Sequence, residues 1–522
     1  MANADTEDKL FIGKAAKPQY LSLNLANRHG LVTGATGTGK TVTLQTIAEG
    51  FSRAGVPVFA ADIKGDLSGV SQEGEGKDWI VKRCKEIDTK YEPDQFPVIF
   101  WDLFGEQGHP IRATVSEMGP LLLSRMMNLN DTQEGVLNIA FRVADENGLP
   151  IMDLKDLRAM LNFVAENSAD LMKSYGNVSS TSVGAIQRQL LVLENQNGEK
   201  LFGEPALEIK DLMKIKDGKG VINLLAADKL MGNPRLYSIF LLWLLSELFE
   251  ELPEVGDLDK PKLVFFFDEA HLLFDEAPKA LLDKIEQVVR LIRSKGVGVY
   301  FVTQNPADVP ETVLAQLGNR VQHALRAYTP KEQKAVKVAA QSFRPNPKIN
   351  VERVITELGK GEALTSFLEG NGVPSMVDRT LIRPPAGNVG PVTDAQRKAV
   401  LAKSPVKGKY DEAMDSESAY EILQKKTDIK TRNADQGDGN QQPSGSTMGG
   451  IGDLIGGIFG TNRKRGEKLS TGQKVAREVT RSVTNRIGGA VAGEIGKKIG
   501  GSMGNTIGRA ILRGALGGIL RR

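Results

Sequence analysis

Cysteine and histidine are scarce in this sequence of 522 residues. It contains one cysteine, Cys84, and four histidines that are scattered along the chain. A single cysteine excludes an intrachain disulfide, and this composition also excludes a cysteine-rich metal site. The sequence therefore predicts a protein of a reducing compartment whose fold does not depend on disulfides or a cysteine-rich metal site.

Long apolar runs are absent as well. The most apolar stretch, Tyr237–Phe249, has 13 residues and includes a glutamate, whereas a helix needs about 20 apolar residues to cross a bilayer. The N-terminal segment MANADTEDKL is polar and acidic and does not resemble a secretory signal. These observations predict a cytoplasmic protein without an integral membrane span, in which Tyr237–Phe249 is a buried core helix.

The chain as a whole carries little excess charge, with a formal net charge of +3. Its parts, however, differ strongly in charge. Residues 461–522 carry 14 Lys and Arg against 3 Asp and Glu, whereas residues 1–460 carry 53 against 61. The body is therefore acidic and the tail strongly basic. This asymmetry favours an anionic partner for the tail, either nucleic acid or a membrane surface.

Short apolar segments alternate with helical patterns along most of the chain. The apolar segments are Gly30–Thr33, Val56–Ala61, Val98–Trp101, Val221–Leu225, Leu263–Phe267 and Val297–Thr303. Their continuous rather than alternating apolar character predicts parallel strands with helices on both faces. Helical patterns over Thr41–Ala54, Tyr237–Phe249 and Ala277–Ser294 lie between or after them. The sequence therefore predicts an α/β fold with a mostly parallel sheet.

The pattern changes between Thr114 and Glu204, where helical periodicity replaces strand-like segments. We therefore expect an all-helical insertion within the sheet domain. Residues 427–447 have the polar composition of a flexible linker. The predicted organisation is an N-terminal core part (1–113), the helical insertion (114–204), a C-terminal core part (205–385), a helical and linker segment (386–447) and a flexible, basic, glycine-rich tail (448–522).

The strongest motif is GATGTGKT, which fits the pattern G-x-x-x-x-G-K-[ST]. It follows an apolar strand and opens a helical stretch, the context in which such a loop binds phosphate. Glycines let backbone N–H groups surround phosphate oxygens, the lysine contacts the β- and γ-phosphates, and the last hydroxyl binds Mg²⁺. The motif predicts an ATP and Mg²⁺ site formed by Gly34, Ala35, Thr36, Gly37, Thr38, Gly39, Lys40 and Thr41.

Two carboxylates follow a second buried strand in the segment LVFFFDEAH, residues 263–271. Ligands of open α/β sheets bind at the carboxyl ends of the strands, so Asp268 and Glu269 should face the nucleotide. Asp268 would hold magnesium, and Glu269 would orient and polarise the attacking water. His271 either couples the nucleotide state to neighbouring elements or only packs.

Other polar residues follow strands that should end at the same edge of the sheet. Gln304 comes directly after Val297–Thr303, where it could contact the γ-phosphate or its water. Asp62 and Lys64 follow another strand and could serve this nucleotide site or that of a neighbouring subunit. Each of these residues could instead be an ordinary polar strand end.

An arginine is the last element expected, because a cation directed at the γ-phosphate accelerates phosphoryl transfer. The candidates are Arg290, Arg293, Arg320 and Arg326, all of which follow the second carboxylate motif. Arg293 lies near the end of a predicted helix, where an arginine can also act as a cap or as a surface residue. The sequence leaves both roles open.

The order of these motifs resembles that of the HerA/FtsK superfamily of ring-forming motor ATPases. The resemblance extends over roughly residues 8–385 and is carried by GATGTGKT, ADIKGD, FFFDEAH and RSKGVGVYFVTQNP. Within the superfamily, the sequence is most similar to the HerA-like bacterial ATPases labelled YjgR. The resemblance implies a RecA-like fold, hexamers with ATP at the subunit interface, and movement along DNA.

Carried over by motif, the resemblance also implies roles for single residues. Lys40 and Thr41 would bind phosphate and magnesium, and Asp268 would assist the metal. Glu269 would be the catalytic base, Gln304 the sensor, and Arg293 would act on the ATP of a neighbouring subunit. HerA proper has a β-barrel before its P-loop, whereas 33 residues precede Gly34 here. A nuclease partner therefore does not follow from the resemblance.

The basic tail repeats apolar residues at every fourth position from Ile487 to Ile511. It could bind double-stranded DNA through its cations, lie on an anionic membrane surface, or only solubilise the chain. The function hypotheses follow the same division. The first is an ATP-driven DNA translocase or helicase, and the alternative is a membrane-associated or protein-remodelling ATPase without DNA activity. A third is a regulatory nucleotide-binding protein with slow turnover.

Overall fold

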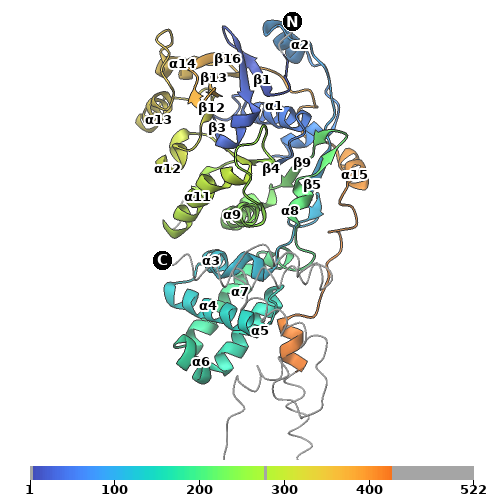
Figure 1. Cartoon of the computed structure of the whole chain (residues 1–522), viewed down its shortest axis with the longest axis vertical. Helices are drawn as coiled ribbons and strands as arrows, with labels where there is room; N and C mark the ends of the chain where they lie inside the picture. Colours follow the sequence, from blue (N-terminus) through green and yellow to red (C-terminus); the bar gives the residue numbers. More distant parts are fainter. Residues whose placement is uncertain (1–3, 275–278, 426–522) are drawn as a thin grey trace, which may run out of the picture. The chain divides into compact units, whose positions relative to one another are not determined.

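A computed structural model describes residues 4–274 and 279–425 of the chain. Residues 4–111 and 207–411 form one compact unit, which we call the sheet unit. Residues 112–206 and 412–425 form a second one, the helical unit (Figure 1). The predicted linker at 427–447 and the predicted basic tail lie outside the described residues.

A 12-stranded sheet runs through the sheet unit in the order β2-β1-β16-β13-β12-β3-β11-β10-β4-β9-β5-β6. From β12 to β6 all neighbouring strands pair in parallel, and the other four strands join through antiparallel pairs. The strands are β1 (Lys9–Lys14), β2 (Pro18–Ser22), β3 (Gly30–Thr33), β4 (Val58–Asp62), β5 (Val98–Asp102), β6 (His109–Pro110), β9 (Ile222–Ala226), β10 (Leu263–Phe267), β11 (Val297–Thr303), β12 (Asn319–Gln322), β13 (Glu362–Ser366) and β16 (Asp378–Ile382). The predicted α/β fold with a mostly parallel sheet is confirmed.

Helices cover both faces of the parallel strands, which explains why those strands are apolar throughout. Val264 and Phe266 of β10 pack in the core beneath α1. Phe265, between them, points to the opposite face and stacks on Phe59 of β4 with ring centroids 4.6 Å apart. The helices α9 and α11 lie on that side of the sheet (Figure 1). The helices of the sheet unit are α1 (Lys40–Arg53), α2 (Asp78–Glu86), α8 (Ile209–Leu212), α9 (Pro234–Glu251), α10 (His271–Phe274), α11 (Lys279–Ile292), α12 (Glu311–Leu314), α13 (Pro330–Gln341), α14 (Val351–Glu357) and α15 (Asp394–Ala402).

The most apolar helix of the chain, α9, is a core element. Its N-terminus is capped by the Asn233 side chain, which accepts the backbone N–H of Leu236 at 3.2 Å. Every residue from Leu236 to Leu248 is buried, as the sequence predicts for a core helix. Among residues 4–274 and 279–425, no helix is long and apolar enough to cross a membrane.

The helical unit consists of helices whose starts are set by local side-chain bonds. Thr114, Asn130 and Asp153 each form a capping box at the start of α3, α4 and α5, which satisfies backbone N–H groups that have no partner inside the helix. The segment 412–425 belongs to this unit, and Ser418 Oγ donates a hydrogen bond to Asp156 Oδ1 at 2.6 Å. The helices are α3 (Val115–Met126), α4 (Asp131–Glu146), α5 (Leu154–Glu166), α6 (Ser168–Tyr175) and α7 (Ser180–Asn195).

Candidate nucleotide site at the carboxyl edge of the sheet

Strand register brings the predicted motifs to one edge of the sheet. Thr33, the last residue of β3, is level with Thr303, the last residue of β11. Phe267 of β10 is level with Phe301 of β11, and Phe266 is level with Ala60 of β4. Because these strands are parallel, the segments that follow them begin side by side. The first residues after β3, β11 and β10 are Gly34, Gln304 and Asp268. The last residue of β4 is Asp62.

The P-loop has a backbone that only glycine adopts readily at three of its positions, Gly34, Gly37 and Gly39. Gly34 has a φ of 151° and Gly39 a φ of 117°, both in the region that a Cβ disfavours. A Cβ at Gly34 would also lie 2.5 Å from the Cβ of His323. The loop is closed by the Thr38 hydroxyl, which donates to the Ala35 carbonyl at 2.7 Å. The helix α1 begins directly after it, at Lys40, so backbone N–H groups at its N-terminus face the loop.

Lys40 lies among the other charged residues of this edge. Its Nζ donates to the Gly34 carbonyl at 2.6 Å and to the Ala35 carbonyl at 3.3 Å. Burial lowers the pKa of Lys40, while the nearby carboxylates of Glu269 and Asp268 act in the opposite direction. The ammonium group is therefore within electrostatic range of both acidic residues of the second motif.

The two carboxylates after β10 have different surroundings. Burial, followed by the charge of Glu269, raises the pKa of Asp268 to about 7. Asp268 Oδ1 accepts the Glu269 backbone N–H at 2.9 Å, and its carbonyl accepts the Tyr237 hydroxyl at 2.9 Å. These bonds fix the turn in which Asp268 and Glu269 follow the strand.

Glu269 combines an unusual backbone with an unsatisfied side chain. Its φ is 47°, in the left-handed region that residues with a Cβ seldom adopt. The buried Oε2 atom has no hydrogen-bond partner and lies 3.4 Å from Nδ1 of His271. A buried acceptor without a partner is costly to the fold, and backbone outliers of this kind cluster at functional sites. The carboxylate can accept a hydrogen bond from a substrate water.

His323 supports the P-loop from behind, a role that the sequence did not indicate. Its Nε2 lies 2.9 Å from Thr43 Oγ1 of α1, and its Nδ1 lies 2.8 Å from the Glu362 carbonyl. Complete burial lowers the pKa of His323 to about 4, so the ring is neutral at physiological pH. Pairing of β12 with β3 brings this residue to the loop, and long-range strand pairing leaves no local sequence signal.

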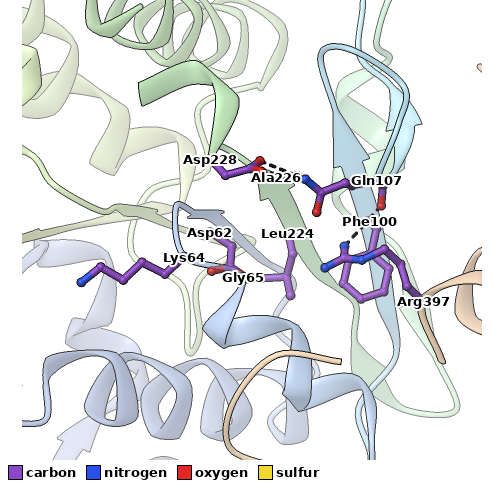
Figure 2. Close-up of a pocket in the computed structure, with 9 residues that line it drawn as sticks. All are labelled: Asp62, Lys64, Gly65, Phe100, Gln107, Leu224, Ala226, Asp228 and Arg397. Atoms are coloured by element: carbon purple, nitrogen blue, oxygen red, sulfur yellow. Dashed lines mark hydrogen bonds between the residues drawn. The ribbon is translucent and has the colours of Figure 1, made fainter. Parts of the chain in front are cut away.

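Asp62 is buried at the end of β4, where it lines a pocket (Figure 2). Its side chain is 7 % exposed. Burial raises the pKa of Asp62 to about 6, although hydrogen bonds from the backbone N–H groups of Leu67 and Ser68 oppose this shift. Lys64 of the same turn is exposed and extends away from the side chains that form the far wall of the pocket.

The remaining sequence candidates occupy different places. Gln304 is exposed at the same edge as the P-loop. Arg326 is exposed four residues after β12, which is parallel to β3, whereas Arg320 donates to three backbone carbonyls and is structural. Arg293 precedes β11 and therefore lies at the opposite edge of the sheet from its own P-loop, where it pairs with Asp257 at 3.2 Å.

The comparison with known proteins identifies a family. A family model described as "Helicase HerA-like C-terminal" matches residues 7–519. The chain is 30% identical over 119 residues to a probable helicase, MJECL08, of Methanocaldococcus jannaschii; this match covers 22% of the chain and 21% of that protein.

Solved structures to which the chain is similar include the following two. One is the plasmid coupling protein TrwB in complex with ADP and Mg²⁺, with 17% identity, coverage of 74% of this chain and 94% of that chain, and a TM-score of 0.46. Another is VirB4 of Thermoanaerobacter pseudethanolicus, with 13% identity, coverage of 76% and 100%, and a TM-score of 0.48.

Proposed function

The chain belongs to the family of HerA-like helicase C-terminal proteins, and from this premise we propose that it is a P-loop ATPase that couples hydrolysis of Mg-ATP to movement along double-stranded DNA. Within the family we assign it to the HerA-like bacterial ATPases labelled YjgR, working in the cytoplasm as a hexamer. The observation that carries the proposal is the convergence of Lys40, Asp268 and Glu269 at one edge of the sheet, within electrostatic range of one another.

The P-loop supplies the phosphate-binding part of the proposed site. Backbone N–H groups of Gly34–Thr41 and the N-terminus of α1 bind the phosphate oxygens. Lys40 now donates to two loop carbonyls, and on nucleotide binding the same ammonium would donate to the β- and γ-phosphates instead. A charge-assisted bond to phosphate is stronger than a bond to a neutral carbonyl, so this exchange favours binding.

Thr41 and Asp268 are the residues that would hold magnesium. Magnesium in such sites keeps several waters and is bound through one or two protein groups together with substrate phosphates. When bound, the ion neutralises charge that develops on the phosphates.

Glu269 is the proposed general base. Its unpartnered carboxylate oxygen would accept a proton from water as the water oxygen bonds to the γ-phosphorus and the bond to the ADP oxygen breaks. Gln304, exposed at the same edge, would hydrogen-bond the γ-phosphate or the water. Asp62 would lie beside Asp268 at the nucleotide without binding magnesium. Together these residues complete a site for in-line phosphoryl transfer to water.

Arg293 fits only a role between subunits. It precedes β11, whereas the P-loop follows the carboxyl end of the adjacent strand β3. An arginine at the opposite end of its own sheet can act as a finger only on the nucleotide of a neighbouring copy. The proposed hexamer provides such a neighbour, and Arg293 is half-exposed with a surface ion pair that is easily exchanged.

Steady-state ATP hydrolysis with and without double-stranded DNA, at low and moderate salt, tests the proposal. We expect magnesium-dependent hydrolysis that DNA stimulates and that rising salt reduces, because phosphate contacts weaken as salt increases. The Glu269→Gln protein is the background control. Hydrolysis that DNA leaves unchanged would overturn the DNA motor and retain the ATPase, and no hydrolysis under any condition would overturn both.

The trans role of Arg293 has its own test. Arg293→Ala and Glu269→Gln proteins, each with low activity alone, should regain activity when mixed under conditions that allow subunit exchange. The gain arises because some interfaces then combine an intact Glu269 with an intact Arg293. Mixed oligomers without any gain, shown by native mass spectrometry, would rule out this arginine as the finger.

A further inference from the structure

A pocket of about 360 Å³ lies beside the candidate nucleotide site, at the carboxyl ends of β4, β9 and β5 (Figure 2). Phe100 and Leu224 give it an apolar floor, and charged side chains form its walls. Asp62 belongs to one wall, and Arg397 of α15 enters from the other side. The pocket is therefore lined both by Asp62, a residue of the candidate site, and by Arg397, which has no role in the reaction proposed above.

Arg397 is held in a defined place. Its guanidinium carbon lies 4.4 Å from the centroid of the Phe100 ring, and NH1 donates to the Gln107 carbonyl at 3.2 Å. The Gln107 side chain is itself fixed by two bonds to the Asp228 carboxylate, at 3.0 and 2.9 Å. Burial lowers the pKa of Arg397, and of the carboxylates that oppose this effect Asp62 contributes most. A guanidinium keeps its charge in such surroundings, so a fixed positive charge faces Asp62 across the pocket.

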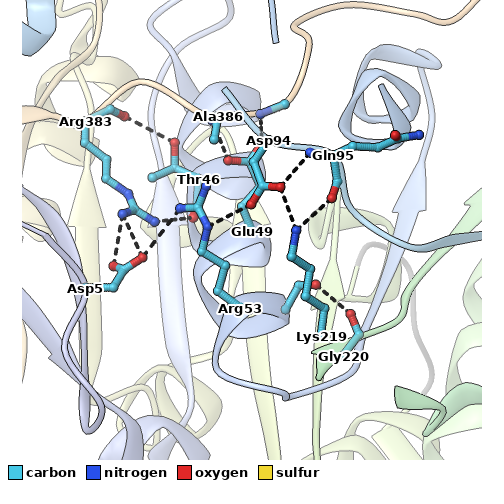
Figure 3. A network of polar contacts seen from close by, with 12 residues as sticks. Asp5, Thr46, Glu49, Arg53, Asp94, Gln95, Lys219, Gly220, Arg383 and Ala386 are labelled. Carbon is cyan, nitrogen blue, oxygen red and sulfur yellow. Dashed lines mark hydrogen bonds and ion pairs between the residues drawn. The ribbon is translucent and has the colours of Figure 1, made fainter. Parts of the chain in front are cut away.

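The segment that brings Arg397 to the pocket is bonded to the P-loop helix. Glu49 of α1, buried in the sheet unit, accepts the backbone N–H groups of Ala386 at 2.6 Å and Gly387 at 3.0 Å (Figure 3). Further along, the Val392 N–H donates to Ser68 Oγ at 3.0 Å. The backbone N–H of Ser68 is one of the two that bind Asp62. The turn that holds Asp62 and the segment that carries Arg397 are therefore joined directly.

We propose that Arg397 is a positioning residue for the candidate ATPase site, in which its guanidinium balances the Asp62 carboxylate and keeps it from drawing magnesium away from Asp268. This inference rests on the proposed ATPase function and adds to it a residue from a part of the chain outside the recognised motifs. Arg397 touches neither nucleotide nor metal in this proposal and acts through Asp62.

The arrangement explains how two carboxylates can lie at the ends of neighbouring strands. Asp62 and Asp268 follow β4 and β10, which pair in parallel, and the charge of Asp62 contributes to the raised pKa of Asp268. Magnesium in nucleotide sites is bound through one or two carboxylates together with substrate phosphates. An unbalanced Asp62 would be a competing ligand close to the productive one, whereas the two N–H groups and the charge of Arg397 oppose the effect of burial on Asp62.

The test is a double-mutant cycle on the full-length protein, with MgATP as substrate. Arg397→Gln is introduced into the wild-type background and into Asp62→Asn, and kcat and KM are measured for all four proteins. In the wild-type background we expect Arg397→Gln to lower kcat about tenfold, the lower end of the range for residues that orient a metal ligand, with KM changed less than twofold. In the Asp62→Asn background the same substitution should change kcat less than twofold, because no carboxylate remains to be balanced.

Two further variants separate charge from structure. Arg397→Lys keeps a positive charge at the pocket and should retain most of the activity that Arg397→Gln loses. Lys398→Gln removes a positive charge from the next residue of α15, which is exposed, and should leave kcat unchanged. If Arg397→Gln alone does not fold, Asp62→Asn/Arg397→Gln should fold, because it removes the unbalanced buried carboxylate.

Three results would overturn the assignment. The first is an Arg397→Gln protein as active as wild type, and the second is an equal loss of kcat in both backgrounds, which marks a purely structural role. The third is that neither Arg397→Gln nor the double variant Asp62→Asn/Arg397→Gln folds. An inactive wild-type protein would instead refute the ATPase function on which the inference rests, so the two failures are distinguishable.

Discussion

The helix starts of the helical unit and the carboxyl edge of the sheet unit differ in how their polar groups are paired. In the helical unit, polar groups find partners close by, as in the capping boxes of Thr114, Asn130 and Asp153. At the carboxyl edge of the sheet unit, burial raises the pKa of Asp268 to about 7 and that of Asp62 to about 6. Burying ionisable groups with incomplete compensation costs free energy of folding. The sheet unit therefore loses folding free energy at the carboxyl edge of its sheet.

This difference separates a unit built to fold from a unit that also has to perform chemistry. Substitutions at the sheet edge should change activity strongly and in some cases increase stability. Comparable substitutions in the helical unit should change stability slightly and leave the chemistry of the sheet edge intact. Matched pairs of substitutions, one in each unit, can therefore test this difference.

The largest effect is expected for Glu269→Gln, which removes the proposed general base but preserves side-chain size. Turnover of ATP should fall by about 1,000-fold, within the range for a lost general base, whereas ATP affinity should change little. A coupled phosphate-release assay and a fluorescent ATP analogue measure the two quantities. Glu166→Gln, on the exposed surface of α5, is the matched control. Near-normal turnover by Glu269→Gln would mean that another group activates the water.

Loss of the P-loop lysine comes next. Lys40→Ala should weaken ATP binding by about 100-fold or more, since it removes a charge-assisted contact to phosphate worth about 2–3 kcal/mol. Isothermal titration calorimetry measures the affinity directly. Lys173→Ala, which removes an exposed lysine of α6 in the helical unit, should bind ATP as the wild type does. Equal affinities of Lys40→Ala and the wild type would refute the assignment of the phosphate site.

A stabilising effect is expected for Asp268→Asn, and it should depend on pH. The raised pKa of Asp268, about 7 in the folded chain, means that its ionised form opposes folding at pH 8. This penalty disappears as pH falls through 7 towards the ordinary aspartate pKa of about 4. We expect Asp268→Asn to raise the free energy of unfolding by about 2 kcal/mol at pH 8, after a discount for solvent screening, and by almost nothing at pH 4.

Urea unfolding followed by tryptophan fluorescence tests this expectation. The three tryptophans, Trp79, Trp101 and Trp243, all lie in the sheet unit, so their emission reports on that unit. Asp170→Asn, on the surface of α6, is the control and should change stability at neither pH. An Asp268→Asn protein that is less stable than wild type at pH 8 would show that the carboxylate is well compensated in the fold.

The smallest effect is expected for the helix cap Asn130. Asn130→Ala removes the side-chain oxygen that accepts the Gln133 N–H at 3.0 Å, which should destabilise α4 by about 1 kcal/mol. Hydrogen–deuterium exchange over residues 131–146 should accelerate, and ATP turnover should stay unchanged. Asn138→Ala, in the exposed middle of the same helix, should not accelerate exchange, since alanine is the better helix former. A large loss of turnover in Asn130→Ala would contradict the separation of the two units.

Much of the sheet could be predicted because its strands are locally distinctive. The predicted strands Gly30–Thr33, Leu263–Phe267 and Val297–Thr303 have the bounds that the structure shows. The antiparallel extension was not predicted. Its N-terminal strands β1 and β2 are short and mixed in composition, and β1 pairs with β16, more than 360 residues away in the chain. Pairing over such distances leaves no periodic signal in either segment.

The candidate site divides in the same way. Residues of contiguous motifs, such as Lys40 and Asp268, could be identified because the motif itself encodes the local geometry. His323 and Arg397 could not, because each is a single residue that long-range packing brings to the edge, through β12 and α15 respectively. An isolated histidine or arginine in a sequence gives no indication of the partner that it will face. Only the folded chain shows that Arg397 faces a carboxylate of the site.

The backbone at residue 269 has a consequence for how this protein can change under selection. A side chain in the left-handed conformation costs the fold about 1 kcal/mol or more, and glycine at that position would remove the strain at a φ of 47°. A screen that rewards only heat resistance should therefore favour Glu269→Gly, a sturdier protein without its proposed base. A screen that rewards turnover should reject the same change. The backbone conformation of residue 269 thus makes thermal stability and turnover favour different residues at this position.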